Sequence, residues 1–376
     1  GRVATSRRGR VDRGMASRGG GAGATARLAL LLVVLLLLPG RGAPDTAPSS
    51  SFASPSPGAP ASSPFAVVAY LPEWRFASTD WDAVCVNVTH LILFSLEVTD
   101  DGSLTSLDRF PSPEAMTTLR AAAAKRGVKL LLSLGGHGRT RGFPIVAVEK
   151  TKRRRLARTL ASFCATHGLH GVDYNWEYPA SPAEWNGMFA LLRTTRKVFD
   201  GSPQRLTITM AYYPDGRQER ELKRGGAEEH VELLHAMSYD HPRGSHSSTA
   251  LARAVIRNAE EAGLDARKIT IGLPFYGRHV ETGEWKTYAE LDAAHGVSAE
   301  PSKDEAGGYA FNGADTIRLK TSEAKAAGTG GVMIWEAGQD LHPSHARSLL
   351  AVVAAEAWGD EGKNAVGEKK RAREEL

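Results

Sequence analysis

Cysteine is scarce in this sequence, with 2 residues among 376. So few thiols exclude a disulfide-stapled scaffold and a multi-cysteine zinc module. The chain also lacks a glycine-rich phosphate loop and an aromatic, basic patch of the kind that binds nucleic acid. Hydrophobic residues make up 42% of the chain, which excludes a wholly disordered protein and predicts a large core.

Positive charge in excess is confined to the beginning of the chain. The formal net charge is +5, from 47 basic and 42 acidic residues. Residues 1–42 contain eight arginines and one acid, Asp12, which leaves 39 basic and 41 acidic residues for the rest of the chain. We therefore expect no large basic field on the folded part, and no nucleic acid as a partner.

Residues 1–42 have the layout of a secretory leader. We expect translation to begin at Met15, and two arginines then precede an apolar run, Leu28–Leu38. As a helix this run spans about 16 Å, roughly half of a bilayer core. Small residues follow, and they predict signal cleavage near Gly42 or Ala43. An uncleaved signal anchor is the alternative.

Two further segments lie outside the expected fold. Residues 43–64 are almost all Ala, Ser and Pro, which predicts a flexible linker. The charged tail, 359–376, ends in Arg373-Glu374-Glu375-Leu376, which is similar to the Lys-Asp-Glu-Leu retrieval signal. With the glycosylation sequon at Asn87, these ends predict the secretory pathway, either the endoplasmic reticulum lumen or secretion. No membrane contact is expected after signal cleavage.

Residues 65–358 alternate short β-rich runs with helical stretches. The runs are Ala66–Leu71, Thr89–Leu96, Val128–Leu134, Gly171–Glu177, Leu206–Tyr212, Val231–Ser238, Lys268–Pro274 and Gly330–Trp335. The helical stretches include Glu114–Arg126, Arg153–Thr166, Ser181–Phe199 and Ser247–Ala262, often followed by glycine (127, 168, 263 and 328). Eight such units predict a (β/α)8 TIM barrel in a single domain. A doubly wound open sheet is the alternative, and it normally has a phosphate loop after its first strand.

The fourth predicted strand carries polar residues in an unusual place. Side chains alternate along a strand, so Asp173, Asn175 and Glu177 share one face, opposite an apolar face. The polar face must then point into the barrel, where carboxylates are costly unless they are hydrogen-bonded. Glu177 lies at the carboxyl end, where barrels of this type hold their active sites. We interpret this strand as the catalytic strand.

This strand resembles the signature of glycoside hydrolase family 18, Asp-x-x-Asp-x-Asp-x-Glu followed by Tyr-Pro. The four signature positions are His170, Asp173, Asn175 and Glu177. Further matching motifs are Ser133-Leu134-Gly135-Gly136, Met237-Ser238-Tyr239-Asp240, Ile271 to Arg278, and Gly330 to Glu336. Because five motifs fall in order on the third, fourth, sixth, seventh and eighth predicted strands, the sequence is similar to chitinases and chitinase-like proteins over nearly all of 65–358.

The resemblance implies a retaining, substrate-assisted mechanism without metal or cofactor. Glu177 would protonate the glycosidic oxygen and later act as base, while the substrate's own N-acetyl oxygen attacks the anomeric carbon. The implied substrates therefore contain N-acetylglucosamine, as in chitin, chitooligosaccharides or N-glycan cores. Asp173, Asn175 and Tyr239 are implied as the other catalytic residues. The implied substrate-binding residues are Trp335, Asp240, Tyr70, Tyr178 and Met237, with Tyr70 and Tyr178 as wall residues of the cleft.

Asn175 departs from the family pattern, which has Asp there. Its side-chain oxygen still accepts an acetamido N–H, but it carries no charge to offset the oxazolinium ion. Such a loss costs on the order of a hundred- to a thousandfold in rate. Two functions therefore stay open: a weak or specialised hydrolase of β-1,4-linked N-acetylglucosamine glycans, and a non-catalytic glycan-binding lectin. His170, which replaces the outermost Asp, should serve mainly the structure.

Several other features are interpreted as structural. Trp74, Trp81 and Trp285 could be sugar platforms, but core or rim packing is the favoured interpretation. His241 and His246 flank Asp240 without a third ligand, so we expect no metal. The stretch between Arg278 and Gly330 is short, which predicts no large insertion domain and a rather open groove. Cys85 and Cys164 are expected as free, buried thiols, and the protein as a monomer.

Overall fold

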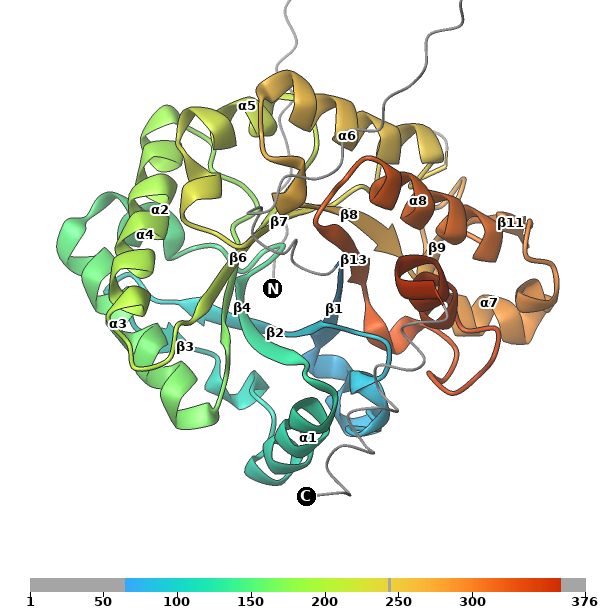
Figure 1. Cartoon of the computed structure of the whole chain (residues 1–376), viewed down its shortest axis with the longest axis horizontal. Helices are drawn as coiled ribbons and strands as arrows, with labels where there is room; N and C mark the ends of the chain where they lie inside the picture. The colour runs from blue at the N-terminus through green and yellow to red at the C-terminus, as the bar shows by residue number, and fades with distance from the viewer. Residues whose placement is uncertain (1–64, 243–244, 360–376) are drawn as a thin grey trace, which may run out of the picture. The chain divides into compact units, whose positions relative to one another are not determined.

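Eight parallel strands close into a barrel in the computed structural model, which describes residues 65–242 and 245–359 (Figure 1). The barrel strands are β1 (Ala66–Pro72), β2 (His90–Val98), β4 (Lys129–Gly135), β5 (Gly171–Asn175), β6 (Thr207–Tyr212), β7 (Leu233–Ala236), β8 (Ile269–Pro274) and β13 (Gly331–Trp335). Each pairs with its neighbour in chain order, and β1 pairs with both β13 and β2, so the sheet closes. The predicted TIM barrel is thus confirmed. A short strand, β3 (Leu104–Thr105), pairs antiparallel with the end of β2.

Helices surround this barrel on the outside (Figure 1). They are α1 (Pro113–Arg126), α2 (Phe143–Val148), α3 (Lys150–His167), α4 (Pro182–Asp200), α5 (Arg217–Arg224), α6 (Thr249–Ala262) and α8 (Ala314–Ala326), and residues 349–359 are also helical. Gly127, Gly168 and Gly263 end α1, α3 and α6 with φ between 66° and 73°, a left-handed conformation that glycine adopts without steric cost. The predicted glycine stops are therefore confirmed for these helices.

Strand β5 alternates as the sequence predicts. The Tyr174 hydroxyl lies 2.7 Å from the Thr195 hydroxyl on α4, so this side chain faces the helical layer. Asp173 points the other way, into the barrel, where its side chain is fully buried. The strand ends at Asn175 rather than at Glu177, because its neighbour β4 ends at Gly135, the residue that pairs with Asn175. Glu177 therefore lies just beyond the strand, at the mouth of the barrel.

The segment between β8 and β13 contains a small α+β unit. Four short strands form an antiparallel sheet in the order β10 (Trp285–Thr287), β9 (Tyr276–His279), β12 (Tyr309–Ala310) and β11 (Glu305–Ala306). Helix α7 (Tyr288–His295) follows β10 directly. This unit occupies one side of the barrel (Figure 1). Its size agrees with the predicted absence of a large insertion domain.

Both cysteines have free thiols and are buried, as predicted. Burial raises the pKa of Cys85 to about 11 and that of Cys164 to about 12, which makes both thiols poor nucleophiles. The predicted leader, linker and tail lie outside the described residues, as does the proposed retrieval signal. Across residues 65–242 and 245–359, no helix is long and apolar enough to span a membrane.

Candidate functional site

A cleft of about 640 Å³ lies at the carboxyl ends of the barrel strands. Its lining residues are Trp74, Phe94, His137, Arg139, Asn175, Glu177, Tyr178, Tyr213, Met237, Tyr239, Asp240, Arg278 and Trp335. The sequence predicts nine catalytic or substrate-binding residues, and seven of them line this cleft. The other two, Asp173 and Tyr70, lie beneath it, so Tyr70 is not the wall residue that the sequence suggested.

Asp173 is the centre of a buried hydrogen-bond network below the cleft. Its carboxylate accepts from the hydroxyls of Tyr70 at 2.8 Å, Ser133 at 3.0 Å and Thr209 at 2.8 Å. These donors come from β1, β4 and β6. Burial raises the pKa of Asp173 to about 6, and the three hydroxyls act in the opposite direction. The three donors thus offset part of the cost of the buried charge, but burial is the larger effect.

His235 is the basic residue nearest to this network. Its Nε2 lies 3.9 Å from Asp173 Oδ1, and its Nδ1 is 2.8 Å from the Thr270 hydroxyl. Burial lowers the pKa of His235 to about 3, so the ring is neutral. The charge of Asp173 is therefore balanced by hydroxyl dipoles and not by a cation.

Asn175 occupies the next position on the same face, at the floor of the cleft. The residue is 2% exposed. Its Oδ1 atom accepts no hydrogen bond from any residue in the described part of the chain. A buried carbonyl without a donor costs about 1–3 kcal/mol, so this oxygen is poised to accept an N–H from a molecule in the cleft.

Glu177 is the carboxylic acid beside this open acceptor. Its side chain is 15% exposed. Burial raises the pKa of Glu177, the nearby charge of His137 and a hydrogen bond from Asn175 lower it, and the charge of Asp240 raises it. His137 Nδ1 lies 4.0 Å from Glu177 Oε2, with the imidazole almost fully exposed at the rim. A raised pKa keeps a carboxylic acid protonated at higher pH, as a general acid requires.

The loop after β7 forms the wall opposite Glu177. Tyr239 is buried, and its hydroxyl contacts Met333 Sδ at 3.6 Å. Burial, together with the charges of Glu177 and Asp240, raises the pKa of Tyr239 well above its usual value, so its hydroxyl stays protonated. Asp240 has φ of 56°, a left-handed conformation that is uncommon for a residue with a side chain. Arg278 Nη1 lies 3.7 Å from its carboxylate.

Aromatic rings form a third wall. Trp335 meets Phe94 edge to face with ring centroids 4.8 Å apart, and it meets Trp74 at 6.5 Å. Trp74 is 52% exposed, so a large apolar face is open to the cleft. The Arg139 guanidinium lies over the rings of Phe94 and Trp74, at 5.3 Å and 5.8 Å from their centroids. The sequence favours packing for Trp74, which the structure instead places in the cleft wall, and no sequence pattern identifies Phe94 or Arg139.

Two ion pairs from one segment hold these aromatic residues. Glu73 accepts two hydrogen bonds from Arg139, at 2.6 Å and 3.2 Å. Arg75 donates to Glu336 at 2.8 Å, and the Glu336 side chain is only 1% exposed. Because Trp74 lies between Glu73 and Arg75, and Trp335 precedes Glu336, both pairs fix residues that flank the aromatic wall.

The small sheet extends this surface beyond the cleft. In antiparallel strands, directly opposed residues point to the same face. Trp285 on β10 pairs with Arg278 on β9, so its side chain, 52% exposed, shares the face of a cleft residue. The next residue, Lys286, lies on the other face, where its Nζ is 4.8 Å from the ring centroid of Tyr309. Trp285 thus continues the cleft surface, while Lys286 does not.

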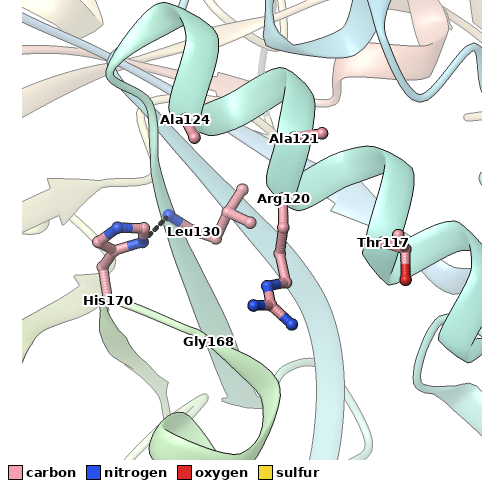
Figure 2. A pocket seen from close by; sticks show the side chains of 7 residues that line it. All are labelled: Thr117, Arg120, Ala121, Ala124, Leu130, Gly168 and His170. Atoms are coloured by element: carbon pink, nitrogen blue, oxygen red, sulfur yellow. Dashed lines mark hydrogen bonds between the residues drawn. The ribbon is translucent and has the colours of Figure 1, made fainter.

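A second hollow, of about 460 Å³, lies at the opposite end of the barrel, between α1 and the loop that precedes β5 (Figure 2). His170 lines it, together with Arg120 and small residues of α1. The His170 Nδ1 accepts the backbone N–H of Leu130 at 3.0 Å (Figure 2). The ring thereby ties the start of β4 to the start of β5, a structural role far from Glu177. Within the described ranges, no group of three or more metal-ligating side chains occurs.

A closed parallel barrel with an acid at the mouth of its fourth barrel strand defines a (β/α)8-barrel protein with its candidate site at the carboxyl ends of the strands. The family model of glycosyl hydrolases family 18 matches residues 66–340. The chain belongs to this family.

The individual proteins to which this chain is similar share a quarter or less of its residues. Chitinase 1 of Aphanocladium album is 25% identical over 347 residues, which cover 73% of this chain and 81% of that protein. Among solved structures, a chitinase from Bacteroides thetaiotaomicron superimposes with a TM-score of 0.67 at 23% identity, over 80% of this chain and 98% of that one. The class V chitinase of Nicotiana tobaccum in complex with NAG4 gives a TM-score of 0.63 at 18% identity, over 78% and 99%. These structural likenesses show the fold.

Proposed function

We propose that this protein hydrolyses β-1,4-linked N-acetylglucosamine glycans with retention and by substrate assistance. Family membership, the chitinase named above and the structure with NAG4 support this substrate class. The observation that carries the proposal is the unsatisfied Oδ1 of Asn175, buried at the floor of the cleft beside Glu177. A sugar with a 2-acetamido group would bring an N–H donor to that place.

The site residues then divide the chemistry as follows. Glu177, with its pKa raised by burial, gives its proton to the glycosidic oxygen. The acetamido N–H donates to Asn175 Oδ1, which turns the acetamido oxygen towards the anomeric carbon. The Tyr239 hydroxyl donates to that oxygen, and Trp335 supports the sugar ring. Attack forms an oxazolinium ion and releases the leaving sugar, and a water activated by the Glu177 carboxylate then opens the ion.

The missing carboxylate at position 175 sets the expected rate. The family pattern places a negative charge there, beside the oxazolinium ion, whereas here the nearest inner charge is Asp173. Two residues along a strand correspond to about 7 Å, so that charge acts from one layer below. Removing a preorganised electrostatic partner typically costs about 3–4 kcal/mol. We therefore propose a slow or specialised enzyme.

A glycan-binding protein without turnover is the second candidate. The observation in its favour is the aromatic wall, with Trp74 half exposed and packed edge to face against Trp335, because such surfaces bind sugar faces whatever the state of the acid. The loss of charge at position 175 points in the same direction. The preserved, pKa-raised Glu177 favours the enzyme.

Hydrolysis of a fluorogenic chitooligosaccharide by the full chain and by Glu177→Gln tests the proposal. We expect slow release of the fluorophore by the wild type and none by the variant. If neither releases it while both bind chitotetraose in calorimetry, the lectin function replaces the enzyme. If neither binds, both candidates are wrong.

The expected location and state of the protein remain proposals. We propose that it acts as a monomer in the secretory pathway, on the grounds of the leader, the sequon at Asn87 and the C-terminal Arg-Glu-Glu-Leu. Expression in a eukaryotic cell tests the proposed location in the secretory pathway. We expect the purified chain to begin near Ala43, and removal of the last four residues to increase its secretion. A chain that keeps its leader in the cytosol contradicts this.

A further inference from the structure

Lys320 is a buried cation that has no part in the chemistry described above. It lies on α8 and is 1% exposed. Its ammonium donates three hydrogen bonds, to the Ser247 carbonyl at 2.7 Å, the Ser247 hydroxyl at 2.8 Å and the Asn312 side-chain oxygen at 2.6 Å. All three acceptors are neutral, so the charge is solvated by dipoles. Burial lowers the pKa of Lys320 to about 7, with Asp304 acting in the opposite direction.

These hydrogen bonds continue from α8 to the end of strand β7. The Ser247 hydroxyl accepts from Lys320 and donates to the Ser238 carbonyl at 2.7 Å. The Ser238 hydroxyl donates in turn to the Gly272 carbonyl on β8 at 2.8 Å. The Ser247 carbonyl also accepts from Asn312 Nδ2 at 2.9 Å, so this residue is held from three directions. A continuous chain of donors therefore joins the α8 ammonium to Ser238.

Ser238 is directly followed by the two residues that face Glu177 from the opposite wall, Tyr239 and Asp240. The left-handed conformation of Asp240 costs energy and persists only where its surroundings fix it. The backbone there is also tightly enclosed, since a Cβ built on Gly272 would lie 2.4 Å from the Ala236 carbonyl oxygen. Ser238 thus connects the hydrogen bonds from Lys320 on α8 to the backbone that carries Tyr239 and Asp240.

We propose that Lys320 is a positioning residue for Tyr239 and Asp240. Through Ser247 and Ser238 its ammonium holds the end of β7 in the conformation that directs those two side chains into the cleft. An apolar residue of similar length would fill the same space without the penalty of a buried charge. What it would not supply is three donors for Ser247 and Asn312. This role rests on the proposed function, because it needs a sugar in contact with Tyr239.

Calorimetric titration of chitotetraose into the full-length Glu177→Gln protein tests the role. Binding stoichiometry reports the folded fraction, while Kd reports the geometry of the site. Adding Lys320→Met should weaken Kd about tenfold at unchanged stoichiometry. Lys325→Met is the matched control on the same helix, since its side chain is exposed and its amine donates to the Glu356 carbonyl at 3.2 Å. We expect that control to leave Kd unchanged.

Two further variants keep the test decisive if Lys320→Met folds poorly. Ser247→Ala removes only the hydroxyl relay and should weaken Kd in the same direction. In a Tyr239→Phe background, Lys320→Met should weaken Kd less than it does alone, because coupled residues are not additive. A fall in stoichiometry with unchanged Kd, or full additivity with Tyr239→Phe, overturns the positioning role. A parent protein that binds no tetramer overturns the proposed function as well, whereas a parent that binds with all variants equal overturns the positioning role alone.

Discussion

Asp173 and Asn175 stand two residues apart on one face of β5, yet their hydrogen bonding is opposite. Asp173 accepts from three hydroxyls on three strands, and Asn175 Oδ1 accepts from none in the described part of the chain. The first is a completed structural centre, and the second is the acceptor that we propose for the acetamido N–H. The pair therefore marks the boundary between the barrel core and the substrate site.

The first prediction concerns the charge at that boundary. Asn175→Asp restores a carboxylate beside the oxazolinium ion, and we expect kcat on a fluorogenic chitooligosaccharide to rise about a hundred- to a thousandfold. Asn175→Leu is the matched control, because it keeps the size of the side chain and removes the acceptor. It should weaken binding of the acetamido sugar. Equal rates in wild type and Asn175→Asp would show that the charge at this position does not limit turnover.

The second prediction concerns the pH dependence of activity. Glu177 must be protonated to act as acid, so kcat/KM should fall as pH rises through its raised pKa. The imidazolium form of His137 lowers the pKa of Glu177, so His137→Gln should move this alkaline limb to higher pH. The shift should be small, because the His137 ring is exposed and screened by solvent. His295→Gln, an exposed histidine at the end of α7, is the control and should leave the profile in place. A shift to lower pH would contradict the assignment.

The third prediction concerns the pH dependence of stability. The folded pKa of Asp173, about 6, lies above its ordinary value, so the folded state holds the proton more firmly between about pH 4 and 6. Ionisation of Asp173 therefore costs stability as pH rises through that window. Relative to Asp173→Asn, the wild type should lose about 2 kcal/mol of unfolding free energy between pH 4 and 7. Urea unfolding at several pH values measures this difference, and a constant difference would refute it.

The fourth prediction concerns the small sheet. If the face shared by Arg278 and Trp285 continues the cleft, Trp285→Ala should raise KM for long chitooligosaccharides about three- to tenfold and leave that for short ones unchanged. Lys286→Ala changes the next residue of the same strand, on the other face, and should affect neither. Equal effects of both variants would assign Trp285 to packing of the hairpin.

The fifth prediction concerns the ion pair behind the aromatic wall. Arg75→Met leaves Glu336 buried without its cation and should cost about 3 kcal/mol of stability, with weaker binding of oligosaccharide because Trp74 and Trp335 adjoin the pair. Arg253→Met breaks an exposed pair with Glu323 and should cost far less stability than Arg75→Met. The midpoints of urea unfolding measure both effects. Similar losses of stability in the two variants would contradict the proposed role of the Arg75–Glu336 pair in holding the aromatic wall.

The sequence predicted the parts of the site that lie on regular strands. Alternation placed Asp173 inside the barrel and Tyr174 against the helices, and the motif after β7 brought Tyr239 and Asp240 to the cleft. It could not show that Tyr70 donates to Asp173 rather than facing the substrate, since that depends on the depth of β1 in the barrel.

The positions of residues in loops could not be predicted from the sequence. Arg139 is held over Trp74 by Glu73 and by the Ser95 hydroxyl, which both accept hydrogen bonds from its guanidinium. Glu73 lies 66 residues away in the sequence, so no local pattern shows this contact. The exposure of Trp74 likewise follows from the ion pairs on either side of it. A periodic pattern predicts a face, but the position of a loop residue is set by partners elsewhere in the chain.

The three hydroxyls around Asp173 have a further consequence. Ser133 and Thr209 lie on β4 and β6, the two strands that flank β5, and Tyr70 lies on β1, which is not a neighbour of β5. The Asp173 carboxyl group therefore links β5 to three other strands from inside the barrel. A substitution at Asn175 breaks no such link, because in the described residues its side chain makes no hydrogen bond to another strand. A substitution at position 175 therefore leaves the contacts between the barrel strands intact. At position 173, replacing Asp by Asn would weaken the hydrogen bonds that link β5 to β1, β4 and β6.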